Sequence, residues 1–164
     1  MATMGARRDR QTTLDVPAAP QSAGAARRFV QAQLDDWDLA VDEDGVVLMV
    51  SELVTNAGLH ADSDATVRLV DLGHCLRIEV SDSSTTPVQL RPHQTGSEAG
   101  RGLRIVDALA SRWGVDAAAD GKTVWFEVLV RPGRDGRTGR VRLIPIRGPT
   151  ARFETRFLLW KPGF

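Results

Sequence analysis

Residues 51–61 read SELVTNAGLHA, and the polar side chains in this segment constrain the fold more than any others. They continue an apolar run that starts at Val46, and at 100° per residue the apolar positions gather on one side of a helix. These positions are Val46, Val50, Leu53, Val54, Ala57 and Ala61. Glu52, Asn56 and His60, spaced four apart, form a separate stripe. Val46 to Ala61 holds one carboxylate and no Lys or Arg, whereas solvated helix faces usually mix both charges.

We interpret the stripe as one wall of a ligand cavity, with an ordinary solvated face as the alternative. Glu52 and Asn56 lie one turn apart and can point oxygen atoms at the same small volume. An amide oxygen can ligate Mg²⁺, which takes few protein ligands together with waters and phosphates. A carboxylate can orient and deprotonate an attacking hydroxyl or water. For His60, packing or hydrogen bonding is favoured over catalysis.

Two weaker signals follow along the chain. Asp82 ends the strand-like segment IEVSDSS, where it either caps a turn or accepts a hydrogen bond from an exocyclic amine such as N6 of adenine. Gly100 and Gly102 bracket Arg101 where a helix begins. Glycines there allow close backbone approach, and free N–H groups with the helix dipole favour phosphate, although such a pair also arises by chance.

A third signal, GKTVWFEV at 121–128, resembles the end of a P-loop but does not qualify as one. Asp116 stands where that motif requires glycine, and a strand rather than a helix follows the Lys-Thr pair. Thr123 either faces a pocket or belongs to a simple hairpin. The three histidines and the one cysteine share no zinc-ligand spacing, and no Gly-x-Ser-x-Gly elbow is present.

Composition indicates a globular protein rather than a nucleic-acid binder. The 164 residues suit one domain, and the single cysteine, Cys75, allows no internal disulfide, which favours a reducing cytoplasm. No segment has the length of a membrane span or of a signal peptide. Residues 29–130 carry seven basic and seventeen acidic side chains, whereas residues 131–164 carry nine basic and two acidic ones. We expect this tail to fold back on the acidic body rather than bind RNA or DNA.

Periodicity predicts an α+β two-layer sandwich, with helices on one face of a mostly antiparallel sheet. Residues 1–22 are predicted to be a disordered leader, 23–130 the folded domain, and 131–164 a basic linker and extension of unknown role. Asp42 is predicted to cap the second helix. The expected elements are helices at 23–37, from Asp42 to His60 and at 101–113, strands at 66–72, 75–82, 113–119 and 122–130, and a long loop at 83–100.

Taken in order, these signals resemble the histidine-kinase-like ATPase family, which has the Bergerat ATP-binding fold. The resemblance rests on ELVTNA at 52–57, Asp82, the long loop at 83–100, GRGL at 100–103 and GKTVW at 121–125. It covers roughly residues 22–130. Within the family, the chain looks most like the small bacterial anti-sigma-factor serine/threonine kinases.

The resemblance implies ATP and Mg²⁺ as cofactors and assigns a role to each matching residue. Glu52 matches the general base, Asn56 the Mg²⁺ ligand and Asp82 the aspartate that reads the adenine amine. Thr123 matches a strand threonine near the adenine. The segment that closes over the phosphates is matched by Gly100, Arg101, Gly102 and Leu103. The implied partners are a sigma factor and an anti-sigma-factor antagonist protein, and many such kinases form homodimers.

One departure from the family pattern leaves a second function open. The family has Asp-x-Gly-x-Gly where this chain has Asp82 followed by Ser83, Ser84, Thr85 and Thr86, so the positive-φ freedom of the glycines is lost. The first hypothesis is therefore an ATP/Mg²⁺-dependent protein kinase. The second is a nucleotide-gated anti-sigma-type binding protein without catalysis. The third is a protein that associates with nucleic acid through its basic tail.

Overall fold

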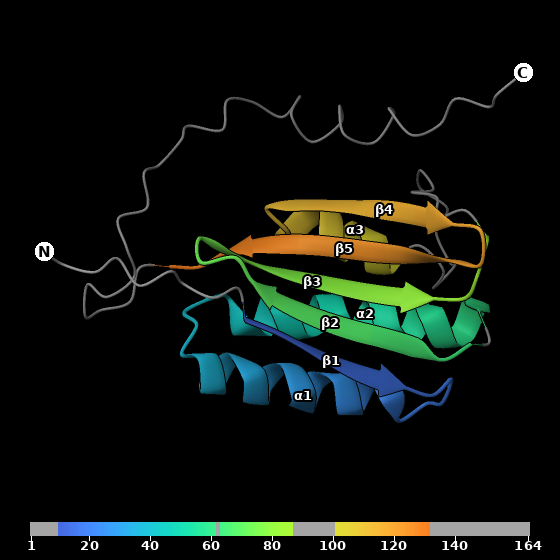
Figure 1. The fold of residues 1–164 in the computed structure, drawn as a ribbon, viewed down its shortest axis with the longest axis horizontal. Coiled ribbons are helices and arrows are strands. Elements are labelled where there is room, and N and C mark those ends of the chain that lie inside the picture. Colours follow the sequence, from blue (N-terminus) through green and yellow to red (C-terminus); the bar gives the residue numbers. More distant parts are fainter. Residues whose placement is uncertain (1–9, 62, 87–100, 132–164) are drawn as a thin grey trace, which may run out of the picture.

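The computed structural model describes residues 10–61, 63–86 and 101–131, and these form one antiparallel sheet with helices on one of its faces (Figure 1). The elements in chain order are β1 (Arg10–Val16), α1 (Ser22–Trp37), α2 (Glu43–Ala61), β2 (Ala65–Asp71), β3 (Cys75–Asp82), α3 (Arg101–Leu109), β4 (Arg112–Ala118) and β5 (Gly121–Leu129). The strand order is β1-β2-β3-β5-β4. The two-layer α+β architecture predicted from the sequence is confirmed.

The predicted disordered leader is wrong from residue 10 onward, because Arg10–Val16 forms the edge strand β1. This strand pairs antiparallel with β2, from Arg10 opposite Asp71 to Val16 opposite Ala65. Arg10 donates to the Asp71 carboxylate at 2.7 Å and to the backbone oxygen of Trp37 at 3.1 Å. Leu14 and Val16 are the only apolar residues of this strand, so the alternation is too short to give a clear strand signal from the sequence.

The ends of the first two helices follow local chemistry. α1 stops at Asp38, which adopts a left-handed conformation (φ 50°) and bonds back to the carbonyls of Asp35 and Leu34. Asp42 precedes α2, and its side chain accepts a hydrogen bond from the backbone N–H of Gly45 at 3.4 Å, in agreement with the predicted cap. Within the described part of the chain, no helix has the length and hydropathy needed to cross a membrane.

The third helix is shorter than the sequence pattern predicts. α3 ends at Leu109, whereas the predicted helix runs to residue 113, and Trp113, which the prediction places at the boundary between helix and strand, belongs to β4. The chain has left the helix by Ser111, whose N–H donates to the backbone oxygen of Glu127 on β5 at 2.9 Å. Trp113 still reaches back to α3, because its indole Nε1 donates to Asp107 at 2.9 Å.

The core lies between the sheet and the helices, and it determines which strand residues can reach a site on the helix side. Successive strand side chains point to opposite faces. The buried helix-facing residues of the two central strands are Leu76, Ile78, Val80, Val124, Phe126 and Val128. Asp82 and Lys122 have the same parity and face the helices, whereas Ser81 and Thr123 face the other side of the sheet.

Candidate functional site

The structure brings together two predicted segments that lie about fifty residues apart in the sequence. A Cβ atom on Gly102 would lie 2.7 Å from Asn56 Nδ2 and 3.1 Å from Glu52 Cβ. The first turn of α3 therefore rests directly on the polar stripe of α2. Glu52 and Asn56 are both half-buried, as expected for the wall of a site rather than for a fully solvated face.

The other residues predicted at the start of α3 differ in their exposure to solvent. Leu103 is buried and belongs to the hydrophobic core, so it anchors the start of α3. Arg101 is exposed at the first position of the helix. Gly100 lies outside the described residues, and so does the side chain of His60. Of the four residues predicted to lie near the phosphates, the structure therefore describes Arg101, Gly102 and Leu103.

Asp82 lies at the end of β3 and forms a buried ion pair that the sequence analysis missed. Its carboxylate Oδ1 accepts a hydrogen bond from Lys122 Nζ at 2.8 Å. The side chains of Asp82 and Lys122 are only 7% and 13% exposed. Strand alternation could have identified Lys122, because residue 122 has the same parity as the core residues Val124 and Phe126.

Two side-chain turns replace the glycines that the family pattern has after Asp82. The backbone N–H of Ser84 donates to Asp82 Oδ1 at 2.8 Å, and the N–H of Thr86 donates to Ser84 Oγ at 3.2 Å. Lys122 Nζ also donates to the Ser84 carbonyl at 3.3 Å. This loop is therefore held by side-chain hydrogen bonds at the positions where the family pattern has flexible glycines.

Gly121 lets β5 begin directly beside Asp82. A Cβ atom at this position would collide with the carbonyl oxygen of Asp82 and lie 3.1 Å from Ser83 Cα. Both neighbours are backbone atoms that cannot rotate away. The close approach holds Lys122 next to Asp82. The end of β3, the start of β5 and the C-terminal half of α2 lie at the same end of the domain (Figure 1).

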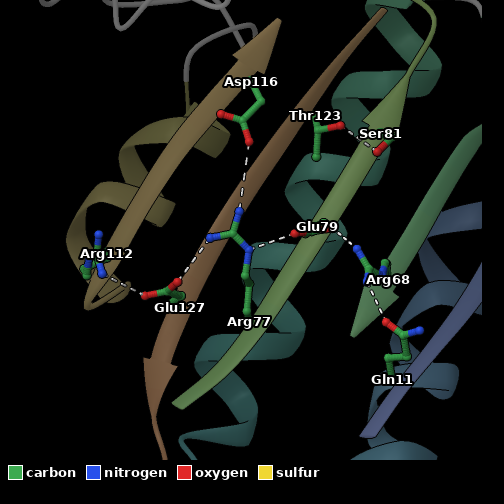
Figure 2. A network of polar contacts seen from close by, with 9 residues as sticks. All are labelled: Gln11, Arg68, Arg77, Glu79, Ser81, Arg112, Asp116, Thr123 and Glu127. Carbon is green, nitrogen blue, oxygen red and sulfur yellow. Dashed lines mark hydrogen bonds and ion pairs between the residues drawn. The ribbon is translucent and has the colours of Figure 1, made fainter. Parts of the chain in front are cut away.

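Thr123 is not placed with Asp82. It lies opposite Ser81 in the β3–β5 ladder, and the two hydroxyls are 2.8 Å apart on the sheet face away from the helices (Figure 2). Lys122, not Thr123, is the residue of the GKT segment that faces the helix side. The predicted role of Thr123 near an adenine has no supporting contact among the described residues.

Charged residues form a network on the same outer sheet face (Figure 2). Arg77 bridges Glu79 at 2.7 Å and Glu127 at 3.1 Å, and its guanidinium stacks over the Trp125 ring at 4.0 Å. Burial acts to lower the pKa of Arg77. The hydrogen bonds to Glu79 and Glu127 outweigh this effect, so the pKa of Arg77 lies above its ordinary value. The network is internally paired, so we interpret it as structural.

The residues on the helix side suit a nucleotide with Mg²⁺ chemically. Gly102 lets the backbone at the start of α3 approach Asn56 closely, and Glu52 and Asn56 supply hard oxygen donors of the kind that Mg²⁺ accepts. The residues that the structure describes contain no group of three or more His, Cys, Asp or Glu side chains able to hold a metal ion alone. A cation bound here would thus take its remaining ligands from phosphate and water.

Comparison with known proteins agrees with this geometry. A model of the family described as "Histidine kinase-like ATPase domain" matches residues 16–128, which include β1's last residue and every other described element up to β5. An uncharacterised protein of Streptomyces coelicolor is 41% identical over 75 residues, which make up 43% of this chain and 70% of that protein.

A solved structure supports the fold. It contains the RsbU and RsbW domains of Rv1364c from Mycobacterium tuberculosis and matches with a TM-score of 0.58 at 21% identity. The match covers 76% of this chain and 34% of the solved chain, so this chain spans about a third of the length of that protein. At this identity the likeness supports the arrangement of helices and strands alone.

Proposed function

This chain belongs to the histidine kinase-like ATPase family, and from that premise we propose that it is an ATP- and Mg²⁺-dependent serine/threonine protein kinase of the anti-sigma-factor type. The contact of Gly102 with Glu52 and Asn56 is the observation that carries the proposal. Two segments assigned to catalysis and to phosphate binding for separate reasons meet in space. Family membership implies that ATP is the ligand.

Each residue of the site has a defined role in this proposal. Glu52 orients the acceptor hydroxyl and takes its proton, and Asn56 holds Mg²⁺ through its amide oxygen. The backbone at Arg101 and Gly102 approaches the phosphates, and Asp82 accepts a hydrogen bond from the base. Bound Mg²⁺ supplies neutralisation of charge on the transferred phosphoryl group. The protein contributes mainly positioning and charge stabilisation.

Calorimetric titration of ATP with Mg²⁺ tests the nucleotide site. The wild-type protein should bind ATP saturably, and Asp82→Asn should lose most of that affinity. Asp116→Asn is the matched control, because the Asp116 carboxylate is 59% exposed and lies on the opposite sheet face. No binding at millimolar ATP, or equal loss in both variants, contradicts the site.

A binding protein without catalysis is the second candidate, and the loop after Asp82 favours it. The side chains of Asp82 and Ser84 accept hydrogen bonds from the N–H groups of Ser84 and Thr86 there, and Lys122 links the loop to β5. The family pattern has flexible glycines in this loop. Under this alternative, ATP changes the affinity for a protein partner but no phosphorylated product forms.

We propose that the partners are a sigma factor and its antagonist protein, with a homodimer as the working assembly. Incubation with ATP and candidate antagonists, followed by mass spectrometry, separates the two functions. A phosphorylated Ser or Thr on the antagonist supports the kinase. Partner binding that responds to ATP with no added phosphate supports the second candidate.

A further inference from the structure

The carboxylate proposed to read the base is already paired with a cation of the same chain. Lys122 Nζ lies 2.8 Å from Asp82 Oδ1, and both side chains are almost fully buried. A neutral base cannot replace the ammonium as a counter-charge. Removing Lys122 from the pair would leave the Asp82 carboxylate with the Ser84 N–H as a donor but without a counter-charge, which is unfavourable at a site with so little exposure. A bound base therefore meets the intact ion pair rather than an isolated carboxylate.

The ion pair offers a ligand both an acceptor and a donor. Within the described part of the chain, the hydrogen bonds of the Asp82 side chain all end on Oδ1, from Lys122 and from the Ser84 N–H, which leaves Oδ2 as an acceptor. The Lys122 ammonium has three N–H groups. Two of them are directed at Asp82 Oδ1 and the Ser84 carbonyl. Among the residues that the structure describes, no acceptor contacts the third, which can therefore donate to a ligand.

An acceptor alone and an acceptor beside a donor select different purines. Adenine carries a donor amine at position 6, whereas guanine and hypoxanthine carry an acceptor oxygen there. A lone carboxylate matches the amine and repels the oxygen, which is the basis for rejecting 6-oxopurines. The Lys122 N–H supplies the donor that the oxygen requires, and Asp82 Oδ2 can accept from the protonated N1 beside it.

We propose that Lys122 makes the Asp82 site accept 6-oxopurine nucleotides, such as GTP and ITP, alongside ATP. This inference rests on the proposed binding of the base at Asp82. It makes Lys122 a specificity-determining residue that the sequence pattern assigns to no role. The nearly complete burial of both charges and the shared contact with Ser84 are the features that carry it.

ATP and ITP form the matched ligand pair, since they differ only at position 6 and in the N1 proton that accompanies the change. Calorimetric titration of the full chain with each, in the presence of Mg²⁺, should give wild-type Kd values within about tenfold of each other. In Lys122→Met, the Kd ratio of ITP to ATP should rise at least about tenfold, because the oxygen then faces an unmatched carboxylate. Arg28→Met, which removes an exposed cation from α1, should leave the ratio unchanged.

The possible outcomes separate this inference from the function beneath it. Wild-type protein that binds ATP but binds ITP more than about tenfold more weakly overturns the inference and leaves the proposed function standing. The inference is also overturned, and the proposed function left standing, if Lys122→Met changes the affinities for ATP and ITP equally. Lys122 would then neutralise Asp82 without contacting the base. Absence of ATP binding by the wild type overturns both. If Lys122→Met does not fold, the wild-type ratio decides alone.

Discussion

Gly102 lies so close to Asn56 that a Cβ atom on the glycine would be 2.7 Å from the amide nitrogen. The start of α3 and the middle of α2 are therefore in direct contact, with no side chain between them. The contact positions Glu52 as well, whose Cβ would be 3.1 Å from the same added atom.

Gly102→Ala should weaken nucleotide binding more than it weakens folding. The end of the Asn56 side chain can rotate away from the new methyl group, which limits the loss of stability but moves the amide from its position. We expect ATP affinity to fall at least about tenfold, with a stability loss of about 1 kcal/mol. Calorimetry and urea denaturation measure the two quantities.

Gly58→Ala is the control for this substitution, because a Cβ atom there meets nothing within 4 Å. It should leave ATP affinity unchanged and raise stability by about 0.5–1 kcal/mol, as expected for replacing an unstrained helical glycine. Loss of ATP affinity in both variants would point to α2 rather than to the contact with Asn56.

Glu52→Gln should separate chemistry from binding. The amide keeps the size of the side chain but cannot take a proton, so phosphoryl transfer from ATP to the antagonist protein should fall at least about a hundredfold. ATP affinity should stay within about threefold, since the base in this proposal acts in the transition state. Glu43→Gln, at the start of the same helix, should change neither quantity. Full activity in Glu52→Gln would remove this residue from the mechanism.

Arg10→Met should destabilise the protein even though half of the arginine is solvent-accessible. The Asp71 side chain is 3% exposed, and Arg10 is its cationic partner at 2.7 Å. The N–H of Gly73 would remain as a donor to Asp71 at 2.8 Å. We therefore expect the free energy of unfolding, measured by urea denaturation, to fall by about 1–3 kcal/mol without complete unfolding.

The double variant Arg10→Met with Asp71→Asn is the control and should recover part of that loss. Equal instability of the single and the double variant would show that the ion pair itself contributes little.

Cys75 should make stability depend on pH above the neutral range. Burial, followed by the nearby Glu127 carboxylate, raises the pKa of its thiol from 9.0 to about 11. The folded state therefore holds the proton more strongly than the unfolded chain does. The resulting stability is fully present below about pH 9 and is lost as pH rises toward about 11.

Urea denaturation at about pH 8 and about pH 10.5 measures this effect. The wild type should lose about 1–2 kcal/mol more than Cys75→Ala between these two values. The alanine variant removes the thiol and leaves the other groups that titrate in this range. An identical loss in both proteins would show that the thiol does not contribute.

Most of the fold was predictable from the arrangement of apolar residues along its long elements. β3 alternates buried and half-buried residues, α2 gathers its apolar residues on one side, and β5 is rich in strand-favouring apolar residues. β1 was not predicted, because Leu14 and Val16 are its only apolar residues and two alternating positions are too few to indicate a strand. Trp113 was predicted both as the end of a helix and as the start of a strand because its spacing suits both, and only pairing with β5 assigns it to the strand.

The sequence by itself determined which residue types make up the site, since a carboxylate, an amide and flanking glycines at fixed spacings reflect local chemistry. It could not place them relative to one another. Only the tertiary structure decided that Gly102 packs on Asn56 and that Lys122, not Thr123, reaches Asp82. The physical reason is that distance across a fold depends on how sheet and helices pack, and that a shift of one residue along a strand moves a side chain to the opposite face.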